Sequence, residues 1–142
     1  MICVSTNFDS KPKDIQVPGL EFCAVTVLAK SRKYVVCAIY TKPTTPTTVF
    51  CDQLRCLMAA IPKKYHVIIT GDFNDNLLDK DNSDLLNCMK EFGFYQYVSK
   101  PTTDSGSLLD HMYYNEMRND ITVEVVDTYF SDHDSVFMTI PF

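Results

Sequence analysis

Three short polar clusters hold the residue types that acid–base and metal chemistry uses. Asp72 and Asn74 follow the apolar run VIITG, and Asp110 lies inside SLLDHMYY. Asp132 and His133 form part of SDHDS, directly before the last apolar run. Functional side chains gather at strand ends on a rigid scaffold, and an Asp inside an apolar strand needs a polar partner. We therefore expect the clusters to mark a site, and Asp110 to be hydrogen-bonded.

The first cluster, GDFNDN, also has two simpler interpretations. A calcium loop of the EF-hand type requires Gly at its sixth position and a bidentate Glu at its twelfth. Leu77 and Ser83 occupy these positions, and the preceding segment has the sequence of a strand, so the calcium loop fails. A solvated turn remains open for this motif alone, because Gly, Asp and Asn favour turns.

Most of the chain has the sequence of short strands. Seven runs that are rich in β-branched or aromatic residues, and bounded by turn signals, predict strands. The first two would form a hairpin and the third a fully buried strand, whereas residues 1–20 are expected to be irregular. The seven runs cover residues 21–29, 33–41, 65–73, 95–98, 108–115, 121–128 and 135–142.

Two helices are expected between these strands. Apolar residues recur at the helical period from Phe50 to Ile61, which predicts one helix there. A second helix is expected over 83–93, with Ser83 as its N-cap and Gly93 just after its end. Many strands with two intervening helices predict a layered α/β architecture with mixed or antiparallel sheets.

Four segments occur in an order that is typical of one enzyme family. They are VVCAIYTKP, in which Tyr40 precedes a Pro-containing loop, then GDFN, PTTDSGSLLDHMYY and SDHDSV. Together they resemble the endonuclease/exonuclease/phosphatase family of metal-dependent phosphodiesterases, and within it the endonuclease domains of LINE-type retrotransposons and the abasic-site DNA endonucleases. The resemblance covers roughly Glu21 to the C-terminus. It implies an α/β sandwich of two packed sheets, of which residues 1–142 would be a single partial domain that lacks the N-terminal strands.

The resemblance implies a role for each residue of the clusters. Asp72 would act as general base on the attacking water, or hold that water in line. Asn74, on the same face of an extended segment, would donate its amide to the phosphate or orient Asp72. His133 would contact the phosphate, and Asp110 would accept a hydrogen bond from its other ring nitrogen. Tyr40 would contact a phosphate oxygen.

The resemblance also implies a metal ligand and weaker substrate contacts. Asp132 would bind Mg²⁺ or Mn²⁺, because carboxylates suit hard ions. Thr102 or Thr103 and Ser131 are weaker candidates for hydrogen bonds around the substrate. The remaining polar residues are expected to be ordinary: a half-buried His66, a His111 that faces away from the site, and a solvated acidic loop and helix start formed by Asp75, Asp79, Asp81 and Asp84.

Two motifs of the family have no counterpart in the sequence, and they keep three functions open. The missing residues are an Asn after the first strand and a metal-binding Glu at the end of a later one. The leading hypothesis is a metal-dependent phosphodiesterase, a DNA endonuclease of retrotransposon type that is impaired by truncation; its parent protein could also hold a reverse-transcriptase domain. One alternative is an inositol-phosphate or lipid phosphodiesterase of the same fold. Another is a non-catalytic remnant or interaction module.

Composition limits the function further. The 142 residues include 13 Lys+Arg and 18 Asp+Glu, a formal net charge of -5, so a module that holds nucleic acid by charge alone is disfavoured. A metal-dependent phosphodiesterase is not disfavoured, because the ion supplies positive charge at the phosphate.

The cysteines and the apolar runs bear on the compartment. The 6 Cys are expected to be free, mostly buried thiols in a reducing compartment; a zinc site from Cys51, Cys56 and a distant His has unsuitable spacing. No signal peptide is recognisable, and no apolar run approaches the roughly 20 residues of a membrane span. We expect a soluble intracellular protein, nuclear if it acts on genomic DNA, that does not bind a membrane.

Overall fold

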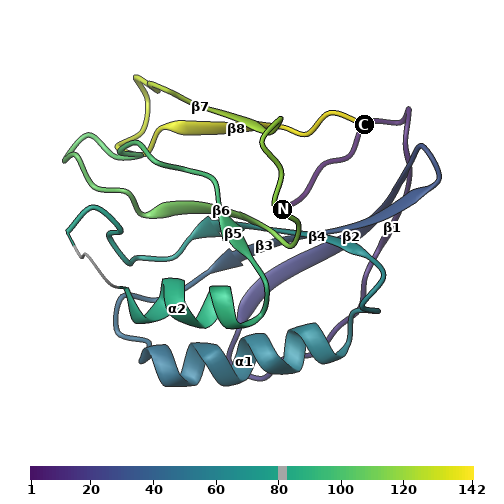
Figure 1. Cartoon of the computed structure of the whole chain (residues 1–142). Coiled ribbons are helices and arrows are strands. Elements are labelled where there is room, and N and C mark those ends of the chain that lie inside the picture. Colours follow the sequence, from purple (N-terminus) through teal and green to yellow (C-terminus); the bar gives the residue numbers. More distant parts are fainter. Residues whose placement is uncertain (80–82) are drawn as a thin grey trace.

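The computed structural model describes residues 1–79 and 83–142, which form layers (Figure 1). The central layer is a six-stranded sheet with the strand order β1-β2-β3-β4-β6-β5. Two helices cover one face of this sheet, and the two-stranded sheet β7-β8 lies over the other face. The expected layered α/β sandwich is therefore confirmed. The elements are β1 Asp9–Pro12, β2 Glu21–Ala29, β3 Arg32–Tyr40, α1 Thr47–Ala59, β4 His66–Asp72, α2 Asp84–Glu91, β5 Tyr95–Gln96, β6 Asp110–Tyr114, β7 Thr122–Val126 and β8 Ser135–Thr139.

The parallel pair β3-β4 determines where the helices lie. Parallel neighbours cannot be joined by a tight turn, so the chain crosses over between them, and α1 makes this crossover. The apolar stripe of α1, with Phe50, Leu54 and Leu57, packs in the main core with Val67 and Ile69 of β4. The apolar residues that recur at the helical period in the sequence thus form the face that α1 buries against the sheet.

Strand β4 is well buried on one face only. Val67 and Ile69 are buried beneath the helices, whereas Ile68 and Thr70, which point the other way, are half-buried. The face toward β7-β8 has its own smaller core around Tyr34. The expectation of a fully buried strand was therefore wrong, because a two-stranded sheet is too narrow to cover six strands.

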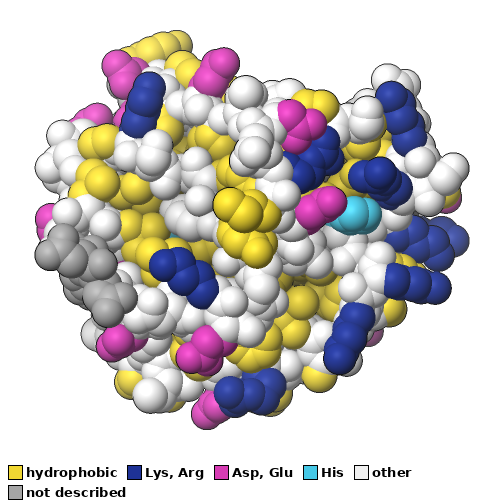
Figure 2. All heavy atoms as spheres, viewed as in Figure 1, with side chains coloured by type: hydrophobic (Ala, Val, Ile, Leu, Met, Phe, Trp, Pro, Cys, Tyr) yellow, Lys and Arg dark blue, Asp and Glu magenta, His cyan; other side chains and the backbone are white. Residues whose placement is uncertain are grey.

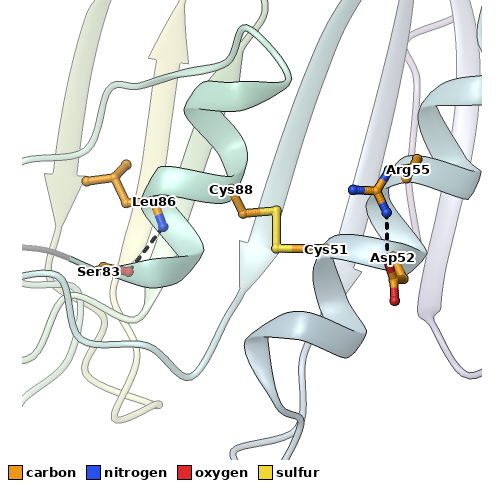
Figure 3. Close-up of a disulfide and its surroundings, with 6 residues drawn as sticks. All are labelled: Cys51, Asp52, Arg55, Ser83, Leu86 and Cys88. Carbon is orange, nitrogen blue, oxygen red and sulfur yellow. Dashed lines mark hydrogen bonds and ion pairs between the residues drawn. A yellow bond between two sulfur atoms is a disulfide. The ribbon is translucent and has the colours of Figure 1, made fainter.

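Helix α2 begins and ends as the sequence predicts. The Ser83 hydroxyl accepts a hydrogen bond from the Leu86 N–H at 3.1 Å, which caps the first turn (Figure 3). Gly93 has a φ of +80°, and its N–H donates to the Lys90 carbonyl at 2.9 Å. A left-handed residue at this position is the usual end of a helix, and Gly adopts it without a steric penalty.

The cysteines do not all form free buried thiols. A disulfide joins Cys51 of α1 to Cys88 of α2, as Figure 3 shows, with the two Cα atoms 6.0 Å apart. Cys37 is buried, and burial raises the pKa of its thiol to about 12, but Cys3 and Cys56 are exposed. The expectation of free thiols was wrong for the pair between the helices, because sequence spacing carries no information on which helix faces meet.

Three other expectations about local structure were wrong. Residues 1–20 are not all irregular, because β1 pairs with β2 antiparallel; a short polar edge strand has no apolar alternation to reveal it. The strand expected over 95–98 is only two residues long, β5. Asp75 is half-buried rather than solvated. Its carboxylate accepts a hydrogen bond from the Ser83 hydroxyl, and its backbone carbonyl lies 2.9 Å from His111 Nε2. Asp81 lies outside the described residues.

The helices of the described ranges have 13 and 8 residues, and neither is long and apolar enough to cross a membrane.

Substitution of Gly71 tests the packing of β4 against β3. Gly71 has a φ of +143°, and a Cβ placed on it would lie 1.8 Å from the Ile39 carbonyl oxygen. We expect Gly71→Ala to lower the free energy of unfolding by about 3 kcal/mol or more, since backbone must move in the central sheet. Urea unfolding followed by circular dichroism measures the loss.

Gly106→Ala is the matched control for that substitution. Gly106 has a φ of +82°, and a Cβ there would meet no atom within 4 Å. Only the left-handed backbone is penalised, at a cost of about 1–2 kcal/mol. Equal losses in the two variants would contradict the close approach of β4 to β3.

Candidate active site

Strand register brings three of the expected site residues into one row. Tyr40 of β3 pairs with Asp72 of β4, and Asp72 pairs with Asp110 of β6. Residues paired in this way point to the same face of a sheet and lie on strands about 5 Å apart. Tyr40, which is 43% exposed, Asp72 and Asp110 therefore form a row across the sheet, on its β7-β8 face. We call these three residues the catalytic row.

His133 joins the row from the loop before β8. Its Nδ1 lies 2.8 Å from Asp110 Oδ2, although the two residues are 23 positions apart. The backbone of the loop is held as well, because Thr103 and His133 form an antiparallel bridge. The Thr128 hydroxyl donates to the His133 carbonyl, and the Ser131 hydroxyl accepts from the His133 N–H at 3.0 Å. The polar partner that Asp110 needs is thus His133, as the sequence predicted.

The carboxylates of the site favour the charged form of His133. The hydrogen bond to Asp110 is the largest cause that raises the pKa of His133 above its ordinary value of 6.5, and the charges of Asp110, Asp72 and Asp132 add to it. Desolvation acts in the opposite direction but does not prevail. Since Nδ1–H donates to Asp110, Nε2 is the nitrogen that can serve a ligand. A protonated imidazole there can donate to an anionic oxygen.

Asn74 lies beside the row but does not occupy an extended segment. Its φ is +49°, so the chain turns immediately after β4 ends at Asp72. The Asn74 N–H donates to Asp72 Oδ1 at 3.0 Å, and its side-chain amide donates to the Thr41 carbonyl at 2.8 Å. The expected extended conformation was therefore wrong. Asn74 orients Asp72 through its backbone, and its amide braces the turn against the end of β3.

Thr102 positions Asp110 from a buried place. It is 0% exposed, and its hydroxyl donates to Asp110 Oδ2 at 2.7 Å while accepting from the Asp110 N–H at 3.1 Å. Thr103 has its hydroxyl in a turn, where it accepts from the Ser107 N–H at 3.0 Å. Both hydroxyls are thus engaged within the protein, Thr102 with Asp110 and Thr103 within its turn, and the expected substrate contacts stay a prediction. Ser131 is exposed and holds the His133 backbone.

The donors for a metal ion are incomplete among the described residues. Asp132 is exposed and contributes one carboxylate. In the part of the chain that the structure describes, no group of three or more His, Cys, Asp or Glu side chains could hold a metal ion. Mg²⁺ held by a single carboxylate keeps most of its waters and binds weakly. The residues present do not make up a metal site, and the zinc alternative also lacks support because Cys51 is in a disulfide.

The other histidines lie away from the row. His111 is buried on the helix-covered face, where it stacks on Phe73 with ring centroids 4.8 Å apart, and burial lowers its pKa. His66 is half-buried at the opposite end of β4 and contacts the Tyr114 hydroxyl at 2.9 Å. Their places agree with the ordinary roles expected for them.

Two exposed aromatic residues next to the site were missed by sequence reasoning. Tyr129 is 100% exposed and Phe130 78% exposed, with their rings edge to face at 5.5 Å, and they directly precede Ser131. Large exposed apolar groups beside a polar site mark places where a ligand binds. The sequence feature that could have revealed them is two adjacent aromatic residues directly before the polar SDH triplet. They lie in a loop without apolar periodicity, so a role in the core does not explain them.

Removal of the Asp110 carboxylate should lower the pKa of His133, because the hydrogen bond to Asp110 is the chief cause of its elevation. We expect the imidazole of Asp110→Asn to titrate at lower pH than that of the wild type, measured by NMR. A raised folded pKa stabilises the fold below the unfolded value near 6.5, and this stability is lost as pH rises through the folded pKa. The variant should therefore lose more stability at pH 6 than at pH 9.

Asp104→Asn is the matched control, since Asp104 lies in the neighbouring turn but is not among the groups that shift His133. An unchanged His133 titration in Asp110→Asn would show that the pair does not control the protonation of the site.

Comparisons with known proteins identify the family and the fold. The model of the endonuclease/exonuclease/phosphatase family matches residues 16–133. The endonuclease domain of TRAS1, a telomere-specific non-LTR retrotransposon, is similar with a TM-score of 0.77 and 20% identity, over 97% of this chain and 71% of that domain. No curated protein matched the sequence.

Two further solved structures share the fold. A family protein from Leptotrichia buccalis has a TM-score of 0.69 and 16% identity, over 85% of this chain and 54% of that one. The human Nocturnin catalytic domain has a TM-score of 0.63 and 17% identity, over 94% and 61%. The chain therefore spans a little over half the length of these two proteins. Identities this low show the fold alone. Because the family model covers more than half of the chain, the chain belongs to the endonuclease/exonuclease/phosphatase family.

Proposed function

We propose that this chain is part of a Mg²⁺- or Mn²⁺-dependent phosphodiesterase that acts as a DNA endonuclease of retrotransposon type. The observation that carries the proposal is the meeting of Asp72, Asp110 and His133, from three separate parts of the chain, at one end of the sheet. Hydrolysis of a phosphodiester needs an oriented water and positive charge at the phosphate. The first can come from Asp72 and part of the second from His133.

On this proposal, Asp72 would act on the attacking water, and His133 and Tyr40 would act on the phosphate oxygens. Asp72 Oδ1 accepts the Asn74 N–H, so Oδ2 is the oxygen that would orient the attacking water and take its proton. Protonated His133 would donate from Nε2 to a phosphate oxygen, while Asp110 keeps its ring in place through Nδ1. Tyr40, partly exposed at the end of the row, would donate its hydroxyl to another phosphate oxygen.

A bound metal ion would neutralise charge on the phosphate, and Asp132 would supply one of its ligands. Because the described residues do not assemble a complete donor set, further ligands must come from outside them. We therefore propose that the activity of this chain alone is impaired.

The aromatic pair favours nucleic acid over the other substrates of this fold. Tyr129 and Phe130 offer exposed ring faces beside Ser131, and nucleobases stack on such faces. An inositol phosphate has no flat apolar surface to place there, so it is the weaker alternative, as is a lipid phosphodiester. On this proposal DNA is the substrate, a reverse-transcriptase domain could accompany the chain in a parent protein, and action on genomic DNA would occur in the nucleus.

A non-catalytic interaction module is the second candidate function. The observation in its favour is that no metal-binding cluster forms in residues 1–79 and 83–142. Such a module would keep its fold and its binding surfaces, but no condition would restore hydrolysis.

Nicking of supercoiled plasmid tests the proposal. We expect the 142-residue chain to cleave weakly, and cleavage to rise when an N-terminal segment of a related complete domain is added. Losing one preorganised stabilising group costs about 10²–10³-fold in rate, so Asp72→Asn and His133→Gln should each abolish the restored activity. Cleavage should require Mg²⁺ or Mn²⁺, stop with chelator, and exceed any release of phosphate from inositol phosphates.

Glu91→Gln is the matched control, because it removes an exposed carboxylate at the end of α2, in the helix layer on the other face of the sheet. Its cleavage should stay near that of the parent protein. Nicking that survives both Asp72→Asn and His133→Gln would refute the assigned site. A folded, complemented protein that never cleaves would leave the interaction module as the function.

A further inference from the structure

A second polar cavity lies at the opposite end of β4 from the catalytic row. It has a volume of about 320 Å³ and is formed by the β2-β3 hairpin and the loop that enters β4. Six steps along the strand separate His66 from Asp72, which is about 20 Å at the rise of a β-strand. The cavity is therefore distinct from the candidate active site. Its lining residues are Ser31, Arg32, Lys33, Lys64, Tyr65 and His66.

Positive charge is concentrated around this cavity in an otherwise acidic chain. Five of the 13 Lys+Arg lie in two segments of four residues or fewer, and all five are exposed. Figure 2 shows such side chains gathered on the right, where the β2-β3 hairpin projects in Figure 1. We call these residues the basic patch. They are Lys30, Arg32, Lys33, Lys63 and Lys64.

The basic patch is not neutralised by the protein itself. Among the described residues, the ion pairs within 4 Å involve other cations: Lys42, Arg55, Arg118 and two histidines. One carboxylate, Glu116, contacts the rim of the cavity through His66 at 3.4 Å. Arg32, Lys33 and Lys64 line the same cavity, where like charges repel one another, so an anion that bridges them would be stabilised.

Local structure holds part of the patch in place. Lys33 Nζ lies over the ring of Tyr65 at 5.6 Å, which keeps this cation at the cavity wall. At the hairpin tip Lys30 and Ser31 have φ values of +44° and +67°, a left-handed pair that closes a two-residue β-turn.

We propose that the basic patch binds the phosphate backbone of nucleic acid, at a site separate from the catalytic row. Arg32 and the lysines supply the donors that phosphate oxygens need, and the concave, aromatic-lined cavity fits a strand better than a flat membrane surface. Binding here is independent of hydrolysis. For a chain of net charge -5, it gives a local contact that the overall charge would not predict.

Fluorescence anisotropy with a labelled 20-base-pair DNA duplex, in EDTA so that no cleavage occurs, tests the proposal. We expect Arg32→Gln/Lys64→Gln to weaken binding at least about tenfold at low salt, and the slope of log K against log salt to become shallower by about 2. Lys90→Gln/Lys100→Gln is the matched control: it removes two exposed charges outside the patch, and affinity should stay within about twofold.

Two further arms separate this site from the proposed function. Asp72→Asn/His133→Gln removes contacts at the proposed catalytic row, and its loss of DNA affinity should be smaller than that of Arg32→Gln/Lys64→Gln, whatever the outcome of the nicking assay. Loss of binding in that variant, with none in Arg32→Gln/Lys64→Gln, would overturn the proposal and assign the contact to the catalytic row. Binding to phosphatidylserine vesicles without binding to DNA would overturn it in favour of a membrane surface.

Discussion

The hydrogen bond between Asp110 and His133 is the interaction on which the rest of the site depends. A carboxylate within a sheet must be compensated, and here the Thr102 hydroxyl and the His133 imidazole both reach Asp110 Oδ2. The bond from His133 also attaches the loop before β8 to the central sheet, and it raises the pKa of His133. One hydrogen bond therefore compensates the Asp110 carboxylate, positions the loop and favours the charged imidazole. Loss of this bond would affect all three.

The register of the central sheet is the second constraint. Tyr40, Asp72 and Asp110 share a face only because β3, β4 and β6 pair with the observed offsets, and a slip of one residue would turn a side chain to the helix-covered face. Gly71 helps to fix the offset, since the Ile39 backbone fills the space of a Cβ. The glycine directly before Asp72 is thus required by packing, apart from any role in a turn.

The sequence predicted what depends on local pattern and on motif order. The caps of α2 followed from residue types and spacing, whereas the pairing of Asp110 with His133 was implied by the family resemblance. Two of the failures depend on long-range geometry. The pairing of Cys51 with Cys88 depends on which helix faces meet. The burial of Thr102 depends on how its loop packs beside β6. The turn at Asn74 is intermediate, because Asn tolerates a left-handed conformation but does not require it.

The two ends of β4 have opposite electrostatic character, and on the proposals above this polarity would let an acidic chain bind an anionic polymer. Carboxylates of Asp72, Asp110 and Asp132 gather at one end and the basic patch at the other, about 20 Å apart along the strand. That separation exceeds the Debye length of about 8 Å at physiological ionic strength, so each end acts on a ligand almost independently. Attraction at the basic patch can therefore hold a phosphate backbone even while the catalytic row, without a metal, repels it.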